Sequence, residues 1–291
     1  MTSFSLNTGQ HIPAVGLGTW RSGPNQVAEA VEFALRNGCR HIDAALRYGN
    51  ESEVGRGIKA SGVPRDQIFL TTKLWNTYHN RVKEGIEESL ANLGTDYLDL
   101  YLIHWPVSLP ADASNTVEDK VLSGWDFINT WAEMQKLVEQ GLVRAIGVSN
   151  FTPSHLERLL SAPSTSIVPA VDQVELHLLN PQPELYEYCT KKNIHLTAYS
   201  PLGSQDSPLY SLPELKEVAK KLDKTVAQVL LAWGIKKGWS VIPKSVSPTR
   251  ILENLGVEFN LPDEDFAVLE AIKERKRLIH GQDFLPVKVF D

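Results

Sequence analysis

Short apolar runs alternate along this chain with longer stretches of helical period. Seven runs of strand length follow one another at residues 41–45, 69–74, 98–105, 145–149, 170–176, 195–200 and 239–243. Around them the apolar positions recur every three or four residues, which predicts helices at residues 25–37, 51–60, 81–93, 125–139, 154–160, 183–192 and 225–237. Strands that alternate with helices of this length indicate βαβ units and a parallel sheet.

An eighth strand is predicted at residues 256–259. Eight parallel strands favour a closed barrel over an open, doubly wound sheet, so the predicted fold class is an α/β protein with a (β/α)8 TIM barrel. Residues 4–6 and 11–15 flank a turn at residues 7–10, a pattern typical of a β-hairpin that caps one end of the barrel. Because no linker, repeat or low-complexity stretch interrupts them, residues 1–291 are predicted to form a single domain.

Charge and composition exclude several classes of partner. The net charge is −6 with acidic and basic residues interspersed, which argues against nucleic-acid binding. The first seven residues lack the features of a signal peptide, and no apolar stretch approaches the roughly 18 residues of a membrane span. Cys39 and Cys189 are too few for a disulfide framework. We expect a cytoplasmic protein without membrane contact, and a monomer, because no apolar stripe calls for a partner.

Ionisable residues stand at the ends of three predicted strands. Asp43, Lys73 and His104 belong to the runs at 41–45, 69–74 and 98–105, and in a barrel the functional groups project from the carboxyl ends of the strands. A lysine inside an apolar run is costly to bury alone, so Asp43 on the neighbouring strand is its natural partner. An ion pair that only stabilises the rim of the barrel is the alternative interpretation.

Tyr48 adds a chemical function to this group. It follows Asp43 by five residues, so its phenol can lie near the Lys73 ammonium. We predict that the ammonium lowers the pKa of Tyr48 from about 10 toward a value useful for proton donation. His104 could orient a carbonyl oxygen by a hydrogen bond while Tyr48 protonates it.

The chain resembles the aldo-keto reductases along nearly its whole length. The matching motifs lie at residues 16–20, 41–51, 72–75, 102–106, 146–151, 199–203 and 242–245. The resemblance implies a catalytic tetrad of Asp43, Tyr48, Lys73 and His104, in which Tyr48 is the proton donor. The implied reaction is the reversible reduction of a small aldehyde, sugar or ketone by hydride transfer from the nicotinamide of NADPH.

The resemblance also implies where the cofactor binds. Tyr199 would stack on the nicotinamide, and Lys244 and Arg250 would hold a 2′-phosphate, which favours NADPH over NADH. Solvated charges are the alternative interpretation of these two cations. The implied contacts of the carboxamide are Ser149, Asn150 and Gln173. The other implied cofactor-binding residues are Thr19, Trp20, Asp43, Ser200, Leu202, Ser204, Ser245, Val246, Glu253 and Asn254.

The implied substrate pocket is a mostly apolar slot with one unusual cation. Its residues are Trp20, Arg47, Trp75, His104 and Trp105. Arg47 stands directly before Tyr48, where the family commonly has a neutral residue. We hypothesise that Arg47 binds a carboxylate or a hydroxyl-rich substrate, and an arginine that points to solvent or to a neighbouring acid is the alternative. Phe284 and Leu285 are candidates to close the pocket from the carboxyl-terminal side.

Two other classes of function remain open from the sequence. One is a binding or regulatory subunit that holds NADPH without fast turnover, against which the complete tetrad argues. The other is a metal-dependent barrel hydrolase. His41 and Asp43 share one strand face, but no second pair of suitable spacing accompanies them, so no metal site is predicted.

Overall fold

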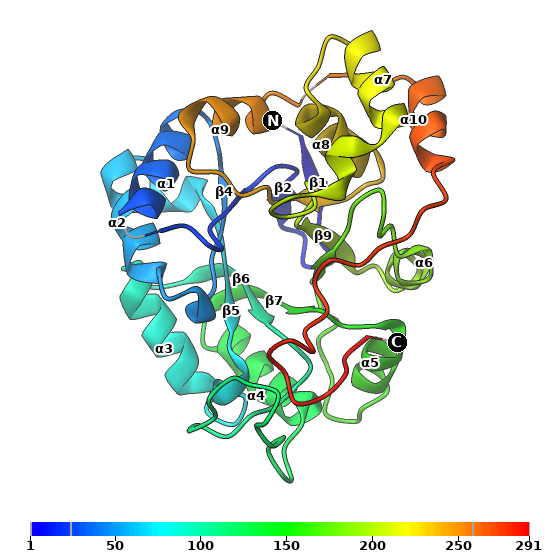
Figure 1. Ribbon diagram of the computed structural model, residues 1–291. Helices are drawn as coiled ribbons and strands as arrows, with labels where there is room; N and C mark the ends of the chain where they lie inside the picture. The colour runs from blue at the N-terminus through cyan, green and yellow to red at the C-terminus, as the bar shows by residue number, and fades with distance from the viewer. Residues whose placement is uncertain (1, 24, 258, 291) are drawn as a thin grey trace.

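The computed structural model describes residues 2–23, 25–257 and 259–290 and shows a barrel of parallel strands surrounded by helices (Figure 1). Within these residues the main sheet has eight strands in the order β10-β9-β8-β7-β6-β5-β4-β3, and neighbouring strands are parallel. The strands are β3 (Leu17–Gly18), β4 (His41–Asp43), β5 (Phe69–Leu74), β6 (Leu98–Ile103), β7 (Val143–Ser149), β8 (Val171–Glu175), β9 (His195–Tyr199) and β10 (Ser240–Val241). The seven strands predicted between residues 41 and 243 are confirmed, each with ends within two residues.

The barrel closes between its first strand and its last. Val15 and Gly18 form parallel bridges with Val241 and Lys244, which join β3 to β10. Gly18 allows this approach, because a side-chain carbon at that position would lie 2.8 Å from the Ile242 carbonyl oxygen. A closed sheet has no free edge, so the backbone groups of all its strands can pair.

The eighth strand is not where the sequence pattern placed it. Residues 256, 257 and 259 are not in a strand, residue 258 lies outside the described residues, and β3 takes this place instead. Val257 is apolar because its side chain packs into the core beside the helices, and not because it belongs to the sheet. The strand β3 was not predicted because two residues are too few to show an alternating pattern.

Helices follow the strands and cover the outside of the barrel (Figure 1). Those at predicted positions are α1 (Gln26–Arg36), α2 (Glu51–Ser61), α3 (Val82–Leu93), α4 (Phe127–Glu139), α5 (Pro153–Leu160), α6 (Pro183–Lys191) and α8 (Val226–Lys236). Capping boxes at Asp126, Thr152 and Thr225 begin α4, α5 and α8. The sequence analysis did not predict α7 (Pro213–Lys221), α9 (Pro248–Leu255) and α10 (Asp263–Glu270).

The amino-terminal hairpin caps the amino end of the barrel, as predicted. Strands β1 (Ser3–Ser5) and β2 (His11–Pro13) pair in antiparallel register, and Gly9 adopts φ +84° in the turn between them. Leu6 and Ile12 are buried against side chains from β5, β6 and β8. The opposite, carboxyl end of the strands is therefore the end that remains for a site.

Candidate active site

A buried ion pair lies at the carboxyl ends of β4 and β5. The Lys73 ammonium is 2.6 Å from Asp43 Oδ1 and donates to the carbonyl oxygen of Ala44 at 2.8 Å. The other carboxylate oxygen, Asp43 Oδ2, accepts a hydrogen bond from Gln173 Nε2 at 2.7 Å. The side chains of Lys73 and Asp43 are only 1% and 2% exposed, so each charge needs these partners. The predicted pairing of Lys73 with Asp43 is confirmed.

Tyr48 lies beside this pair, at the end of the 3-10 helix η1 (Leu46–Tyr48). Lys73 Nζ donates to the Tyr48 hydroxyl at 3.3 Å. Burial, with the negative charge of Asp43, raises the pKa of Tyr48 well above its ordinary value. The predicted lowering of this pKa is therefore wrong, because burial disfavours the charged phenolate and the negative charge of Asp43 adds to this effect. The phenol consequently keeps its proton at neutral pH.

His104 faces Tyr48 from the end of β6. Its ring lies edge-on to the ring of Tyr48, with the centroids 5.7 Å apart, and edge-on to Trp75 at 5.2 Å. Burial, and to a lesser degree the charges of Lys73 and Arg47, lower the pKa of His104 well below its ordinary value. The imidazole is therefore neutral at physiological pH, and a neutral imidazole has one N–H that can donate to a carbonyl oxygen.

Polar side chains from β7, β8 and β9 extend the site. Asn150 Nδ2 donates to the carbonyl oxygen of His104 at 2.9 Å, and its Oδ1 accepts from the Tyr199 hydroxyl at 2.7 Å. Ser149 Oγ donates to the carbonyl oxygen of Gln173 at 2.7 Å. Asn150 is almost fully buried and has φ +64°, a strained conformation for a residue with a side chain. Strain of this kind is common at functional sites.

Two cations lie close together beyond the end of β10. Lys244 and Arg250 are exposed, and partial burial together with the charge of Arg250 lowers the pKa of Lys244. No described carboxylate lies within 4.0 Å of either side chain. Lys244 precedes α9 and Arg250 lies in its first turn, and this helix has no side-chain cap at Ser247. An uncapped helix amino terminus and two unpaired cations suit a phosphate group.

The predicted cofactor residues next to these cations differ in burial and in their contacts. Ser245 Oγ accepts from the backbone N–H of Ser247 at 3.1 Å, Asn254 is buried, and Val246 packs against the core. Burial raises the pKa of Tyr210, while the charge of Arg250 lowers it and that of Glu253 raises it.

The remaining predicted cofactor residues lie in loops at the carboxyl ends of β3 and β9. Thr19 Oγ1 donates to the carbonyl oxygen of Asp43 at 2.9 Å, which joins it to the ion pair. Trp20 is partly exposed, and the guanidinium carbon of Arg21 lies 4.2 Å from the centroid of its ring. Leu202 is partly buried against the core. Ser200 and Ser204 have φ +47° and +63°, so this loop also holds strained residues.

Aromatic side chains form a wall next to His104. Trp75 and Trp105 belong to a small apolar cluster with Leu285 and other residues of the carboxyl-terminal segment. Trp105 also contacts the Phe284 ring, at a centroid distance of 5.4 Å. The exposed guanidinium of Arg47 lies 5.2 Å from the centroid of Trp75, and no described carboxylate lies within 4.0 Å of it. Arg47 thus stands unpaired at the edge of this wall.

Comparison with known proteins identifies the family of this chain. Residues 14–274 match the sequence model of the Aldo/keto reductase family. The chain belongs to the aldo/keto reductase family. It is an oxidoreductase, and its resemblance to that family, noted from the motifs, is confirmed. No group of three or more His, Cys, Asp or Glu side chains in its described part is arranged to hold a metal ion.

Similar proteins include enzymes from fungi and animals. This reductase is 45% identical to the glycerol 2-dehydrogenase (NADP(+)) of Saccharomyces cerevisiae, over 99% of this chain and 96% of the relative. It is 44% identical to the D-galacturonate reductase of Hypocrea jecorina, over 92% and 89% of the two chains. The solved structure of the aldose reductase of Schistosoma japonicum superposes on this chain with a TM-score of 0.89. The two sequences are 38% identical, and the superposition covers 98% of each chain.

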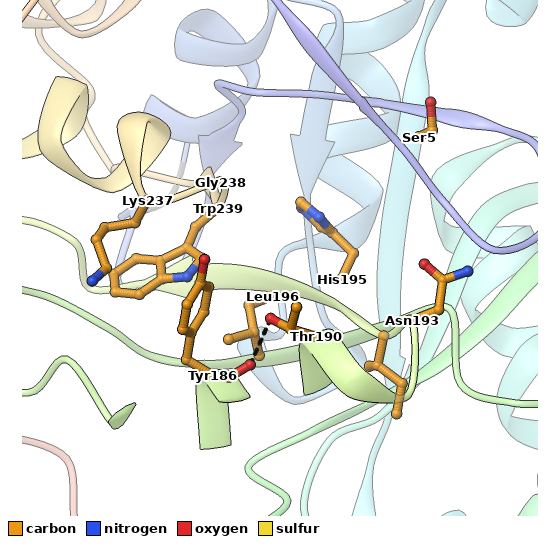
Figure 2. A pocket seen from close by; sticks show the side chains of 10 residues that line it. Ser5, Tyr186, Thr190, Asn193, His195, Leu196, Lys237, Gly238 and Trp239 are labelled. Atoms are coloured by element: carbon orange, nitrogen blue, oxygen red, sulfur yellow. Dashed lines mark hydrogen bonds between the residues drawn. The ribbon is translucent and has the colours of Figure 1, made fainter. Parts of the chain in front are cut away.

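None of the helices in the described ranges has the length and apolar character that crossing a bilayer requires. At the amino end of the barrel, Tyr186, Lys237 and Trp239 gather at one side of a hollow that also borders His195 (Figure 2). The Lys237 ammonium is already paired with Glu270 at 2.9 Å, so this hollow offers no free charge. It also lies opposite the end of the barrel that carries Asp43 and Lys73.

Sequence reasoning missed two groups of buried polar residues. Glu51 accepts a hydrogen bond from Thr72 Oγ1 at 2.6 Å just behind Lys73. Glu175 and His177 form a fully buried pair at the end of β8, with Glu175 Oε1 and His177 Nε2 2.9 Å apart. The rule that identified Asp43 could have found Glu175, because it too is an acid at the end of an apolar strand.

Proposed function

We propose that this enzyme uses NADPH to reduce the carbonyl group of small aldehydes, sugars or ketones to alcohols, and that the reaction is reversible. The contact of Lys73 with both Asp43 and the Tyr48 hydroxyl carries this proposal, because it places a protonated phenol next to a buried cation. The activities in the names of the glycerol 2-dehydrogenase (NADP(+)) and the D-galacturonate reductase support it.

Tyr48 is the proposed proton donor. Its raised pKa keeps the phenol protonated, so the group is ready to give its proton to a carbonyl oxygen that gains negative charge. Lys73 lies 3.3 Å from the hydroxyl and would stabilise the phenolate that remains. Asp43 holds the ammonium in place, and its negative charge opposes the lowering of the pKa of Lys73 that burial causes.

His104 is the proposed orienting residue. Because its imidazole is neutral, it donates a hydrogen bond without adding a second positive charge beside Lys73. Its ring lies edge-on to Tyr48, so a carbonyl oxygen between the two rings can receive a hydrogen bond from each. Two donors fix both the position and the direction of the carbonyl group.

The residues of the site fit a nicotinamide cofactor with a 2′-phosphate. When bound, NADPH supplies the hydride to the carbonyl carbon. The amide groups of Asn150 and Gln173 and the hydroxyl of Ser149 offer donors and acceptors for a carboxamide, and the Tyr199 ring lies beside them. The unpaired cations Lys244 and Arg250 offer the charge that a phosphate requires.

The proposal is tested by following NADPH consumption at 340 nm with a panel of neutral aldehydes, sugars and uronic acids. We expect turnover of several of these compounds, and no loss of activity after dialysis against a chelator. Tight binding of NADPH with no turnover of any carbonyl compound would instead support a binding or regulatory subunit. Loss of this NADPH-dependent activity after chelation would contradict a mechanism that uses only the side chains of the site and the cofactor.

The choice of NADPH over NADH should depend on the two cations. Replacing both, in Lys244→Met/Arg250→Met, is expected to lower kcat/KM for NADPH by about 10²-fold, since each charged hydrogen bond to phosphate is worth roughly 1.5–3 kcal/mol before solvent screening. The value for NADH should stay within about twofold, because NADH lacks the 2′-phosphate. Lys216→Met, at an exposed lysine on α7, is the matched control. An equal loss with both cofactors would contradict the assignment.

Arg47 is proposed to favour substrates that carry a carboxylate. It is unpaired and lies over Trp75 at the pocket wall, and the D-galacturonate reductase among the relatives is named for an acidic sugar. Arg47→Leu is expected to lower kcat/KM for galacturonate about tenfold relative to galactose, and added salt should reduce the difference in the wild type. Arg56→Leu, at an exposed arginine on α2, is the control. An unchanged ratio of the two sugars would show that Arg47 only faces solvent.

A further inference from the structure

The carboxyl-terminal segment, residues 273–290, crosses the carboxyl end of the barrel without forming a helix or a strand (Figure 1). Leu285, Val289 and Phe290 are buried against the wall of the pocket formed by Trp75 and Trp105. The backbone comes so close that a side-chain carbon at Gly281 would lie 2.8 Å from the Trp105 ring. The position of this segment therefore determines the space left beside Trp75, and Trp75 in turn contacts His104.

A buried carboxylate fixes where this segment begins to cross. Glu175 Oε1 accepts a hydrogen bond from the backbone N–H of Leu278 at 2.8 Å, and Oε2 accepts from the backbone N–H of Ile279 at 2.7 Å. His177 Nε2 donates to Oε1 at 2.9 Å. The side chains of Glu175 and His177 are both 0% exposed, so no water competes for these bonds.

Burying a carboxylate is unfavourable unless hydrogen-bond donors replace the lost water. Two of the N–H groups that do so for Glu175 belong to the carboxyl-terminal segment, so the carboxylate is satisfied only while the segment is in place. Further bonds hold the same stretch, from the Lys276 N–H to the Leu179 carbonyl oxygen at 2.7 Å and from Arg277 Nη2 to Gln182 Oε1 at 3.1 Å. The apolar contacts hold the segment against the barrel, whereas the hydrogen bonds to Glu175 fix its position along the barrel.

We propose that Glu175 is a positioning residue that holds the carboxyl-terminal segment against Trp105, and that it thereby sets the size of the carbonyl compound that the pocket admits. The inference rests on the proposed reductase function. Glu175 lies at the end of β8, two residues after Gln173. The same strand therefore binds both the Asp43–Lys73 ion pair, through Gln173, and the carboxyl-terminal segment, through Glu175.

The experiment compares the wild type with Glu175→Gln, which keeps the shape of the side chain but replaces one acceptor with an NH₂ donor that faces backbone N–H groups. We expect faster hydrogen–deuterium exchange in peptides from residues 276–290. We also expect the ratio of kcat/KM for a bulky aromatic aldehyde to that for a three-carbon aldehyde to change by about tenfold, because one or two pocket contacts alter selectivity by this order. The kcat for the small aldehyde should stay within about twofold.

Two further variants make the result specific. Asp99→Asn, at a buried carboxylate that accepts the Leu70 N–H far from the segment, should change neither readout. Ile279→Pro removes a donor from the other side of the contact and leaves Glu175 intact, so it should reproduce the effect of Glu175→Gln even if that variant folds poorly.

Unchanged exchange in residues 276–290, or faster exchange with unchanged selectivity, would overturn the inference. A similar effect of Asp99→Asn would overturn it as well, because any loss of a buried carboxylate would then suffice. A wild type that turns over no carbonyl compound would contradict the proposed function, whereas the exchange measurement would still report whether Glu175 holds the segment. The two failures are therefore distinguishable.

Discussion

Tyr48→Phe is expected to lower kcat by about 10²–10⁴-fold, the usual contribution of a general acid. The substitution removes only the hydroxyl that lies 3.3 Å from Lys73 Nζ, and the ring can keep its edge-on contact with His104. Binding of NADPH should stay within about twofold, because no proton is transferred when the cofactor binds. Steady-state kinetics with a good aldehyde substrate and a fluorescence titration with NADPH measure the two quantities.

A second tyrosine supplies the matched control. Tyr101 on β6 is fully buried, and its hydroxyl has no hydrogen-bond partner in the described part of the protein. Tyr101→Phe therefore removes the same atom from a place outside the site and should leave kcat within about twofold, with a small or favourable effect on stability. If Tyr48→Phe kept more than about a tenth of wild-type kcat, another group would have to supply the proton.

Lys73→Met should damage both stability and activity. It leaves the carboxylate of Asp43 buried without its cation, and breaking a buried pair in this way costs about 3–5 kcal/mol of the free energy of unfolding. The Asp43 side chain is 2% exposed, and among the described residues only Gln173 would still donate a hydrogen bond to its carboxylate. We also expect kcat to fall by at least about 10²-fold, because no charge remains to stabilise the phenolate of Tyr48. Urea denaturation and steady-state kinetics measure the two effects.

The double variant Asp43→Asn/Lys73→Met separates the two roles. With both charges removed, no unpaired ion is buried, so most of the lost free energy of unfolding should return. Activity should stay low, because the ammonium beside Tyr48 is still missing. A double variant as unstable as Lys73→Met would contradict the account of the ion pair. Recovery of activity along with stability would show that the pair is only structural, which is the alternative that the sequence left open.

The sequence predicted the strands and helices wherever a periodic pattern was long enough to read. The bounds of the strand from Phe69 to Leu74 were predicted without error, and all six of its residues are buried. Leu17 and Gly18 form a strand only because β4 and the chain near Lys244 lie on either side of them. Neither neighbour can be read from two residues, so the position of the eighth strand was wrong.

Site residues were predictable for a similar reason. Asp43, Lys73 and His104 each stand at the end of an apolar run, and parallel strands bring their carboxyl ends to one rim. Local sequence cannot show distances, however. The bond between Gln173 and Asp43 joins residues 130 positions apart, and Glu175 meets Ile279 over 104 positions. The role of Glu175 was therefore missed, although its position resembles that of Asp43.

Periodicity along the chain was enough to predict the barrel, its strands between residues 41 and 243, and the polar residues at the carboxyl ends of these strands. Contacts between distant parts of the chain set how the barrel closes, how the carboxyl-terminal segment is fixed, and the direction of the pKa shift of Tyr48. Periodic burial is a local property, because it repeats within a few residues. The closure of the barrel, the position of the carboxyl-terminal segment and the pKa of Tyr48 are not local. They depend on burial and on charges that distant parts of the chain bring together.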